Sequence, residues 1–152
     1  MTKLTLDTYL PYRLSMASNK VSALIAKAYE ARFGLSIPQW RILVVLSEGM
    51  ALSQKGLIER TAMDKVTISR AVATLVARGL LVKENALPDR RKDVLSLSHA
   101  GLSIVAEVAP LALEFEASLI ASLDATQQES LHAMLRLLES RADTLMVLGH
   151  NS

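Results

Sequence analysis

The chain has 152 residues, which is enough for one compact domain with an ordinary hydrophobic core. Hydrophobic residues make up 51% of the sequence but aromatic residues only 4%, so Leu, Ala and Val supply most of the apolar content and favour a mostly helical protein. The sequence has no cysteine, which excludes disulfides, thiolate metal sites and cysteine redox sensing.

The charge is unevenly distributed along the chain, although its net value is only +2. Residues 53–97 hold nine Lys/Arg against five Asp/Glu, whereas residues 98–152 hold two against seven. This asymmetry favours a polyanionic partner for the middle of the chain, the alternative being a solvated charge pattern without function. Lys3 and Asp7 argue against a signal peptide, and no apolar run approaches the ~18 residues of a membrane span. We therefore expect a soluble, cytoplasmic protein without a membrane partner.

A long first helix is predicted from about Thr8 to Phe33. Thr8 is a suitable N-cap, Pro11 falls in the first turn, and Gly34 is a typical helix end. An apolar stripe at spacings of three and four residues marks one face of this helix. The stripe consists of Leu14, Ala17, Val21, Leu24, Ala28 and Ala31.

Three shorter helices are predicted next, beginning at Ser36-Ile37-Pro38, after Ser53 and after Asp64. The first ends before Gly49, the second at about Arg60 and the third at about Arg78, before Gly79. A tight connection, Thr61-Ala62-Met63, separates the second from the third. Four residues of the first are expected to pack inward: Trp40, Leu43, Val44 and Leu46.

Beyond residue 80 the apolar period changes from helical to alternating. Residues 81–84 and 94–97 are predicted to form an antiparallel hairpin with a basic, turn-rich tip. Ser98 then caps a fifth helix to about Leu123, interrupted or kinked near Pro110. A capping-box pattern at residues 124–127 opens a sixth helix to about Leu148.

The long terminal helices carry more apolar surface than the small middle region can cover. The last helix has its own stripe of Leu131, Met134, Leu135, Leu138, Ala142 and Leu145. Because soluble monomers rarely expose large apolar patches, we expect residues 1–34 and 98–152 to form a homodimerisation region. The alternative is that these helices pack within one chain. Residues 35–97 then form a winged helix-turn-helix, and the whole chain is one compact domain.

The helix after Asp64 has the two faces expected of a recognition helix. Its inner face holds Ile68, Ala71, Val72 and Leu75. The outer face is small, polar and basic, and comprises Val66, Ser69, Arg70, Ala73, Thr74 and Ala77, flanked by Lys65 and Thr67. Arg70 can donate two hydrogen bonds to the edge of a guanine, and Thr67 and Ser69 can form hydrogen bonds with bases or phosphates. Val66 can contact the methyl group of a thymine. A solvated surface is the alternative, but no acidic residue occurs between Lys65 and Arg78.

Further DNA contacts are predicted on both sides of this helix. Ser53 and Gln54 begin the preceding helix, where free backbone N–H groups favour a phosphate, although Ser53 also suits simple capping. The hairpin tip clusters Arg90, Arg91 and Lys92, which suit the minor groove or its phosphates, while Asp89 is expected to hold an arginine in place. A solvated turn is the alternative for the tip.

The order and spacing of these elements resemble the MarR family of bacterial transcriptional regulators over nearly the whole chain. The resemblance includes residues 35–43, Thr67-Ile68-Ser69-Arg70 and Arg78-Gly79-Leu80. Its most specific part is the wing signature of Asp89, Arg91, Leu95, Leu97 and Gly101, with Ser98 in place of the usual Thr. The resemblance implies a dimer built from the first, fifth and sixth helices that binds a pseudo-palindromic operator. It also implies that Arg91 is the wing arginine, oriented by Asp89.

Many members of this family lose DNA affinity when a small phenolic or aromatic acid binds. Tyr12, Arg13, Trp40 and Arg41 lie on the helices that line that site in the family. An arginine suits a carboxylate, and the rings suit stacking on an aromatic effector. The alternatives are a core role for Trp40 and dimer contacts for Tyr12 and Arg13.

An enzyme is the main rival class, but the sequence offers no catalytic, cofactor or metal site. The three histidines, His99, His132 and His150, are scattered, and none has a nucleophile or metal ligand at a useful spacing. A helical module that dimerises without binding DNA is the second rival. We therefore predict a DNA-binding transcriptional regulator, acting as a repressor, that needs no cofactor.

Overall fold

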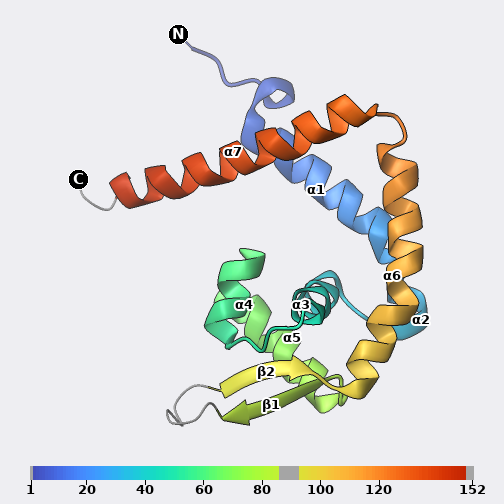
Figure 1. Cartoon of the computed structure of the whole chain (residues 1–152). Helices are drawn as coiled ribbons and strands as arrows, with labels where there is room; N and C mark the ends of the chain where they lie inside the picture. The colour runs from blue at the N-terminus through green and yellow to red at the C-terminus, as the bar shows by residue number, and fades with distance from the viewer. Residues whose placement is uncertain (1, 86–92, 150–152) are drawn as a thin grey trace. The chain divides into compact units, whose positions relative to one another are not determined.

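The computed structural model describes residues 2–85 and 93–149 (Figure 1), and it confirms a mostly helical fold with a two-stranded antiparallel hairpin. The elements are a 3-10 helix η1 (Leu6–Thr8), then α1 (Leu10–Ala26), α2 (Glu30–Phe33), α3 (Ile37–Ser47), α4 (Gln54–Thr61), α5 (Lys65–Ala77), β1 (Leu81–Asn85), β2 (Asp93–Leu97), α6 (His99–Ile120) and α7 (Ala125–Gly149). Contacts divide the chain into two compact units, Met1–Leu113 and Glu114–Ser152, which are described separately. The predicted grouping of residues 1–34 with 98–152 stays a prediction.

The core of the first unit lies among α3, α4 and α5. Ile42 and Leu43 of α3, Leu57 of α4, and Ile68 and Leu75 of α5 are completely buried there. Burying such side chains stabilises the fold by roughly 1.5–3 kcal/mol each. These contacts fix α4 against α5 as a helix-turn-helix, as the sequence predicts.

Side-chain caps define where the helices of this core begin. Ser36 and Gln39 form a reciprocal capping box at α3, and the Ser53 hydroxyl accepts a hydrogen bond from the Gly56 N–H at α4. Asp64 accepts the Thr67 N–H at α5, with an N···O distance of 2.8 Å. The predicted caps are confirmed. Each satisfies a backbone donor that the helix itself leaves unpaired.

The hairpin pairs β1 with β2 in the register Leu81↔Leu97 to Asn85↔Asp93. Leu52, in the segment between α3 and α4, adds a β-bridge to Leu95, with N···O distances of 3.0 and 2.8 Å in the two directions. The base of the wing is therefore hydrogen-bonded to the chain that leads into α4. The predicted tip residues Asp89, Arg90, Arg91 and Lys92 lie outside the described residues.

The start of α6 packs closely against the end of α5. The Ser98 hydroxyl donates to the Gly79 carbonyl at 2.6 Å and accepts the Gly101 N–H at 3.1 Å, so Ser98 is the predicted cap. A Cβ at Gly101 would collide with the Leu80 carbonyl oxygen. Of the two alternatives predicted near Pro110, the interruption does not occur, since α6 is one helix from His99 to Ile120, and the kink stays a prediction. Proline has no N–H for the carbonyl of Ala106, four residues earlier, and because Ala106 is exposed this carbonyl can be hydrated.

The single helix predicted from Thr8 to Phe33 is wrong. Thr8 does not cap α1, because its hydroxyl donates to the Thr5 carbonyl within η1 and the N-cap is Tyr9, without a side-chain hydrogen bond. Pro11 does fall in the first turn of α1, as predicted.

A break at Lys27–Tyr29 separates α1 from α2, and it is formed by buried residues rather than by a helix breaker. Ala26, Ala28 and Tyr29 are all buried, and the Tyr29 ring stacks on Trp40 with centroids 5.1 Å apart. Tertiary packing of the tyrosine thus overrides local helix propensity. Gly34, with φ of +62°, then ends α2 as predicted.

The second unit contains α7, which begins at a reciprocal capping box. Asp124 N–H donates to the Gln127 side chain at 2.9 Å, and Gln127 N–H donates to the Asp124 carboxylate at 2.8 Å. No residue of α7 is buried within this chain. The exposed apolar side chains of α7 include Leu131, Met134, Leu137, Leu138, Leu145 and Met146. None of the described helices is long and apolar enough to cross a membrane.

Candidate nucleic-acid interface and neighbouring pocket

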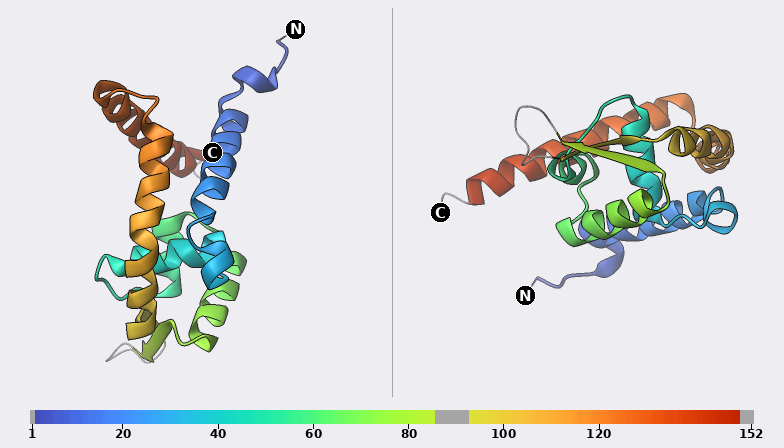
Figure 2. Two further views of the ribbon diagram at one scale, coloured as in Figure 1. Left: turned by 90° about the vertical axis from the view of Figure 1, so that its right-hand side faces the viewer. Right: turned by 90° about the horizontal axis from the view of Figure 1, so that it is seen from below.

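Helix α5 separates its core residues from its polar residues onto opposite faces. Ile68, Ala71, Val72 and Leu75 are buried, as predicted. The outer face is exposed at Lys65, Val66, Ser69, Arg70, Ala73, Thr74 and Ala77. Figures 1 and 2 show that α5 and the hairpin lie at the end of the first unit farthest from the N-terminus. A helix with this small outer face can approach the floor of a major groove.

The guanidinium of Arg70 is available to an external ligand. Arg70 is exposed, and within the described part of the chain no hydrogen bond or ion pair holds its side chain. Its five N–H donors have the fork geometry that matches the O6 and N7 acceptors of guanine. This side chain therefore meets the steric requirement for base reading.

The hydroxyl group of Thr67 already donates its hydrogen bond within the protein. Thr67 Oγ1 donates to one carboxylate oxygen of Asp64 at 2.8 Å, while its N–H donates to the other at 2.8 Å. These two hydrogen bonds hold the pKa of Asp64 below its usual value. Thr67 is half-buried and keeps only acceptor capacity, so it suits an amino group of adenine or cytosine.

The N-terminal end of α4 places the two other predicted contacts. Ser53 is half-buried and its hydroxyl caps the helix, which matches the capping alternative for this residue. Gln54, the first residue of α4, is also half-buried. Their contact with a phosphate stays a prediction.

A shallow depression of about 280 Å³ lies between the start of α3 and the outer face of α5. It is lined by Ser36, Pro38, Gln39, Thr67, Arg70, Ala71 and Thr74. Sequence reasoning missed Ser36 and Gln39 because a capping box explains both residues fully without any ligand. Their proximity to Arg70 is a consequence of how α3 packs on α5.

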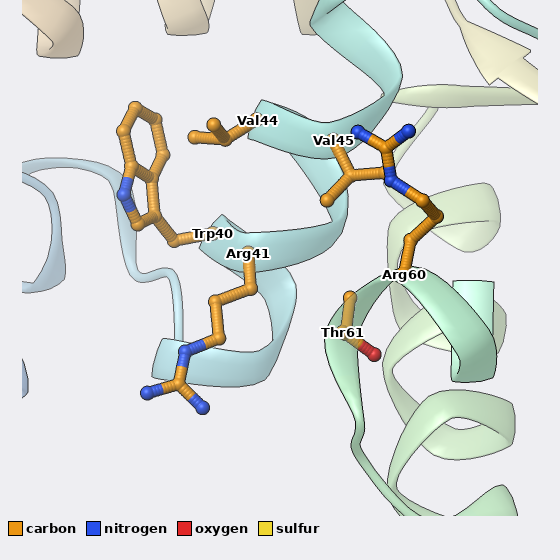
Figure 3. A pocket seen from close by; sticks show the side chains of 6 residues that line it. All are labelled: Trp40, Arg41, Val44, Val45, Arg60 and Thr61. Carbon is orange, nitrogen blue, oxygen red and sulfur yellow. The ribbon is translucent and has the colours of Figure 1, made fainter. Parts of the chain in front are cut away.

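A second pocket, of about 270 Å³, lies between α3 and α4 (Figure 3). Its lining residues are Trp40, Arg41, Val44, Val45, Arg60 and Thr61. Figure 3 shows Trp40 and Arg60 on opposite sides of this pocket, with the valines of α3 between them. An aromatic wall, an aliphatic floor and two guanidinium groups suit a small aromatic acid.

Both arginines of this pocket are held by neighbours. Arg41 donates to the Ser22 hydroxyl of α1 at 2.9 Å, and Arg60 forms an ion pair of 2.6 Å with Glu48 at the end of α3. Sequence reasoning included Trp40 and Arg41 but missed Arg60 and Thr61, which the connection between α3 and α4 brings opposite them. Tyr12 and Arg13 are not among the lining residues; Tyr12 is half-buried and Arg13 exposed on α1.

Trp40 is at once a core residue and a pocket wall. It is 9% exposed and stacks on Tyr29 with an interplanar angle of 20°. Burial raises the pKa of the Tyr29 phenol, and the positive charge of Arg41 opposes this only in part. The aromatic pair therefore stays neutral at physiological pH and packs as apolar material.

The chain resembles known regulators in both sequence and structure. The sequence model of the MarR family matches residues 33–92. A probable transcriptional regulator from Pseudomonas aeruginosa is 34% identical, with a TM-score of 0.75 over 88% of this chain and 99% of that one. The chain belongs to the MarR family.

Other relatives agree with this assignment. A MarR/EmrR family regulator from Acinetobacter sp. ADP1 superposes with a TM-score of 0.85 at 23% identity, over 93% of this chain and 99% of that one. The repressor NicR of Pseudomonas putida is 28% identical over 129 residues, covering 78% of this chain and 82% of NicR. This MarR-family protein is thus a DNA-binding transcriptional regulator and not an enzyme, as predicted.

Proposed function

We propose that this MarR-family regulator represses transcription as a homodimer that binds a pseudo-palindromic operator and is released by a small aromatic or phenolic carboxylate. In each copy, α5 enters a major groove and reads bases with Arg70, Ser69, Thr67 and Val66. Ser53, Gln54, Lys65 and Thr74 contact phosphates or groove edges. The wing residues Arg90, Arg91 and Lys92 reach the neighbouring minor groove, and Asp89 orients an arginine there.

The homodimer is supported by apolar surface that each unit leaves exposed. In the first unit, Leu6, Leu10 and Leu14 are at least 40% exposed on η1 and α1. In the second, the apolar side chains of α7 are exposed along its length. A second copy of the chain would remove this surface from water, and two-fold symmetry would present two α5 helices to one duplex.

The observation that carries the effector is the pocket lined by Trp40, Arg41 and Arg60. The carboxylate of the effector pairs with a guanidinium, and its ring packs against Trp40 and the valines. Support also comes from a relative, BpsR of Bordetella bronchiseptica, whose DNA binding is regulated by 6-hydroxynicotinic acid. PcaV of Streptomyces coelicolor was likewise crystallised with its natural ligand.

A salt titration tests the DNA part of the proposal. Binding to a random duplex is measured by fluorescence anisotropy over a range of salt concentrations. We expect log affinity to fall linearly with log salt, with a slope near −0.9 for each phosphate contacted. Affinity that is insensitive to salt, or no binding at low salt, would favour the rival reading of a dimerising module that ignores DNA.

A thermal-shift screen tests the effector. Hydroxylated benzoic and nicotinic acids, including 6-hydroxynicotinic acid, are added at millimolar concentration. A compound present at 100 times its Kd stabilises the folded state by about 2.7 kcal/mol. A hit is then repeated with Arg41→Ala and Arg60→Ala, and it should lose most of its shift. A shift of equal size in both variants would place the binding site elsewhere.

A further inference from the structure

The C-terminal end of the recognition helix α5 is bound to the short helix α2. Arg78, the C-cap of α5, donates from Nη2 to the Phe33 carbonyl at 2.6 Å and from Nη1 to the Gly34 carbonyl at 3.3 Å. These two carbonyls belong to the end of α2, where the helix leaves acceptors unpaired. One planar guanidinium therefore joins two helices that are about 45 residues apart in the sequence.

The other end of α2 leads directly to the effector pocket. Tyr29 precedes α2, and its carbonyl accepts the Phe33 N–H at 3.1 Å. The Tyr29 ring is 1% exposed and stacks on Trp40, which lines the pocket. Since α2 is a single turn of four residues, Tyr29 and the carbonyls bound by Arg78 cannot move independently over any large distance.

We propose that Arg78 is a positioning residue that couples the pocket at Trp40 to the DNA-reading helix α5. The path runs from Trp40 through Tyr29 and the one-turn helix α2 to Arg78. This inference rests on the proposed function, because it assumes that α5 contacts DNA and that the pocket binds an effector. A ligand that displaces Trp40 shifts Tyr29, moves the Phe33 and Gly34 carbonyls and changes how α5 is held.

The start of α6 also contacts the C-terminal end of α5, and these contacts differ from those of Arg78. The Ser98 hydroxyl donates a short hydrogen bond to the Gly79 carbonyl. Gly101 lies so close to the Leu80 carbonyl oxygen that a Cβ at this position would collide with it. That contact is rigid, whereas the hydrogen bonds of Arg78 are exposed and made by a long side chain. Arg78 is therefore the adjustable link, and the junction with α6 is the fixed one.

Reciprocity gives a test that needs no effector. If the pocket and α5 are coupled, DNA binding changes the affinity of the pocket for its effector by the same factor as the effector changes the affinity for DNA. In the proposed path this change passes through a shift of Trp40, which can be followed without effector. Trp40 is the sole tryptophan of the chain, so its emission and its quenching by acrylamide report on the pocket alone. The experiment follows this fluorescence while a duplex selected from a random library is added, with duplex binding measured separately by anisotropy.

The variants separate coupling from folding. In the natural protein we expect the Trp40 emission or quenching constant to change on saturation with duplex. Arg78→Ala should still bind the duplex, with affinity lowered a few-fold, but the change at Trp40 should disappear. The matched control is Lys20→Ala, which removes a positive charge from an exposed site on α1 outside the proposed path, and it should keep the full change. Arg78→Lys retains the charge but not the two-donor fork, and it should lose most of the signal.

Each outcome is decisive. If the natural protein does not bind the duplex, the proposed function fails and the coupling fails with it. If it binds without any change at Trp40, or if Arg78→Ala and Arg78→Lys keep the full change, the coupling is refuted while the proposed function stands. Thermal unfolding of each variant identifies a loss of fold. If Arg78→Ala does not fold, the comparison of Arg78→Lys with Lys20→Ala decides.

Discussion

Arg70 is exposed on the outer face of α5 and has no partner among the described residues, so its charge and donors are free for the operator. We predict that Arg70→Ala lowers affinity for the selected operator by about 1–3 kcal/mol and weakens discrimination against a mutated site. Competition anisotropy with matched and mismatched duplexes measures both effects. The control Lys27→Ala removes a positive charge from an exposed site outside α5 and should preserve discrimination.

Arg91, at the predicted wing tip, is expected to act differently. A contact with a phosphate, or one that depends on the width of the minor groove, carries little information about the base sequence. Arg91→Ala should therefore weaken binding to all duplexes alike. The slope of log affinity against log salt should become shallower by about one unit. A loss restricted to a few base pairs would instead assign Arg91 to direct base reading.

At the level of the element, the cap of α5 makes its stability depend on pH. The pKa of Asp64 is lowered in the folded protein by the Thr67 hydrogen bonds, so the stabilisation is present above the unfolded-state pKa. It is lost as the pH falls through the lower, folded-state pKa. Asp64→Ala should therefore reduce the melting temperature at neutral pH but by much less in strong acid.

Asp64→Asn is the matched control for this cap. Asparagine keeps an acceptor oxygen for the Thr67 N–H but carries no charge, so the stability difference between Asp64→Asn and Asp64→Ala should vary little with pH. Differential scanning calorimetry across the acidic range compares the three proteins. A constant difference between the natural protein and Asp64→Ala at every pH would show that the charge of the carboxylate does not matter.

Two glycines near helix starts, Gly101 in α6 and Gly56 in α4, give different predictions for substitution by alanine. Helix propensity favours Ala over Gly by about 1 kcal/mol at either position. Gly101→Ala nevertheless should destabilise by roughly 1–3 kcal/mol, because the new Cβ collides with the Leu80 carbonyl. Gly56→Ala in α4 meets only ordinary contacts of 3.4 Å and beyond, and should be neutral or stabilising. Urea unfolding measures both; equal signs would refute the steric account.

The sequence predicts most elements because local chemistry determines them. Ser36, Ser53, Asp64 and Asp124 each place a cap oxygen where a backbone donor needs one, and the structure confirms all four helix starts. The break at Lys27–Tyr29 escaped prediction because no Gly or Pro marks it. The helix breaks there because Tyr29 stacks on Trp40, which lies eleven residues further along the chain.

The candidate sites also divide into features that local sequence patterns predict and features that depend on tertiary contacts. The recognition face follows from helical spacing, so its exposure was predictable residue by residue. Arg60 joins the pocket only because the chain turns back after α3, and Arg78 reaches α2 only in the folded chain. Contacts of this kind depend on tertiary geometry, which a single sequence does not encode in any local pattern.

At the level of the whole molecule, we predict a dimer of the full chain. Light scattering should give twice the chain mass, because exposed leucines on α7 need a partner surface. The double variant Leu138→Glu/Leu145→Glu should yield monomers and lose most operator affinity. Ser140→Glu adds one negative charge, half of that in the double variant, to the same helix at an exposed polar position, and it should remain dimeric. A natural protein that is monomeric at micromolar concentration would refute this prediction.

The separation of α5 into a buried face and an exposed face has an evolutionary consequence. We expect substitutions at exposed sites such as Ser69, Arg70 and Ala73 to change folding stability by only about 0.5 kcal/mol or less, because these side chains are exposed. After gene duplication, the copies can therefore drift toward different operators while the fold stays intact. Promoter choice in such a lineage can change quickly on a scaffold that changes slowly.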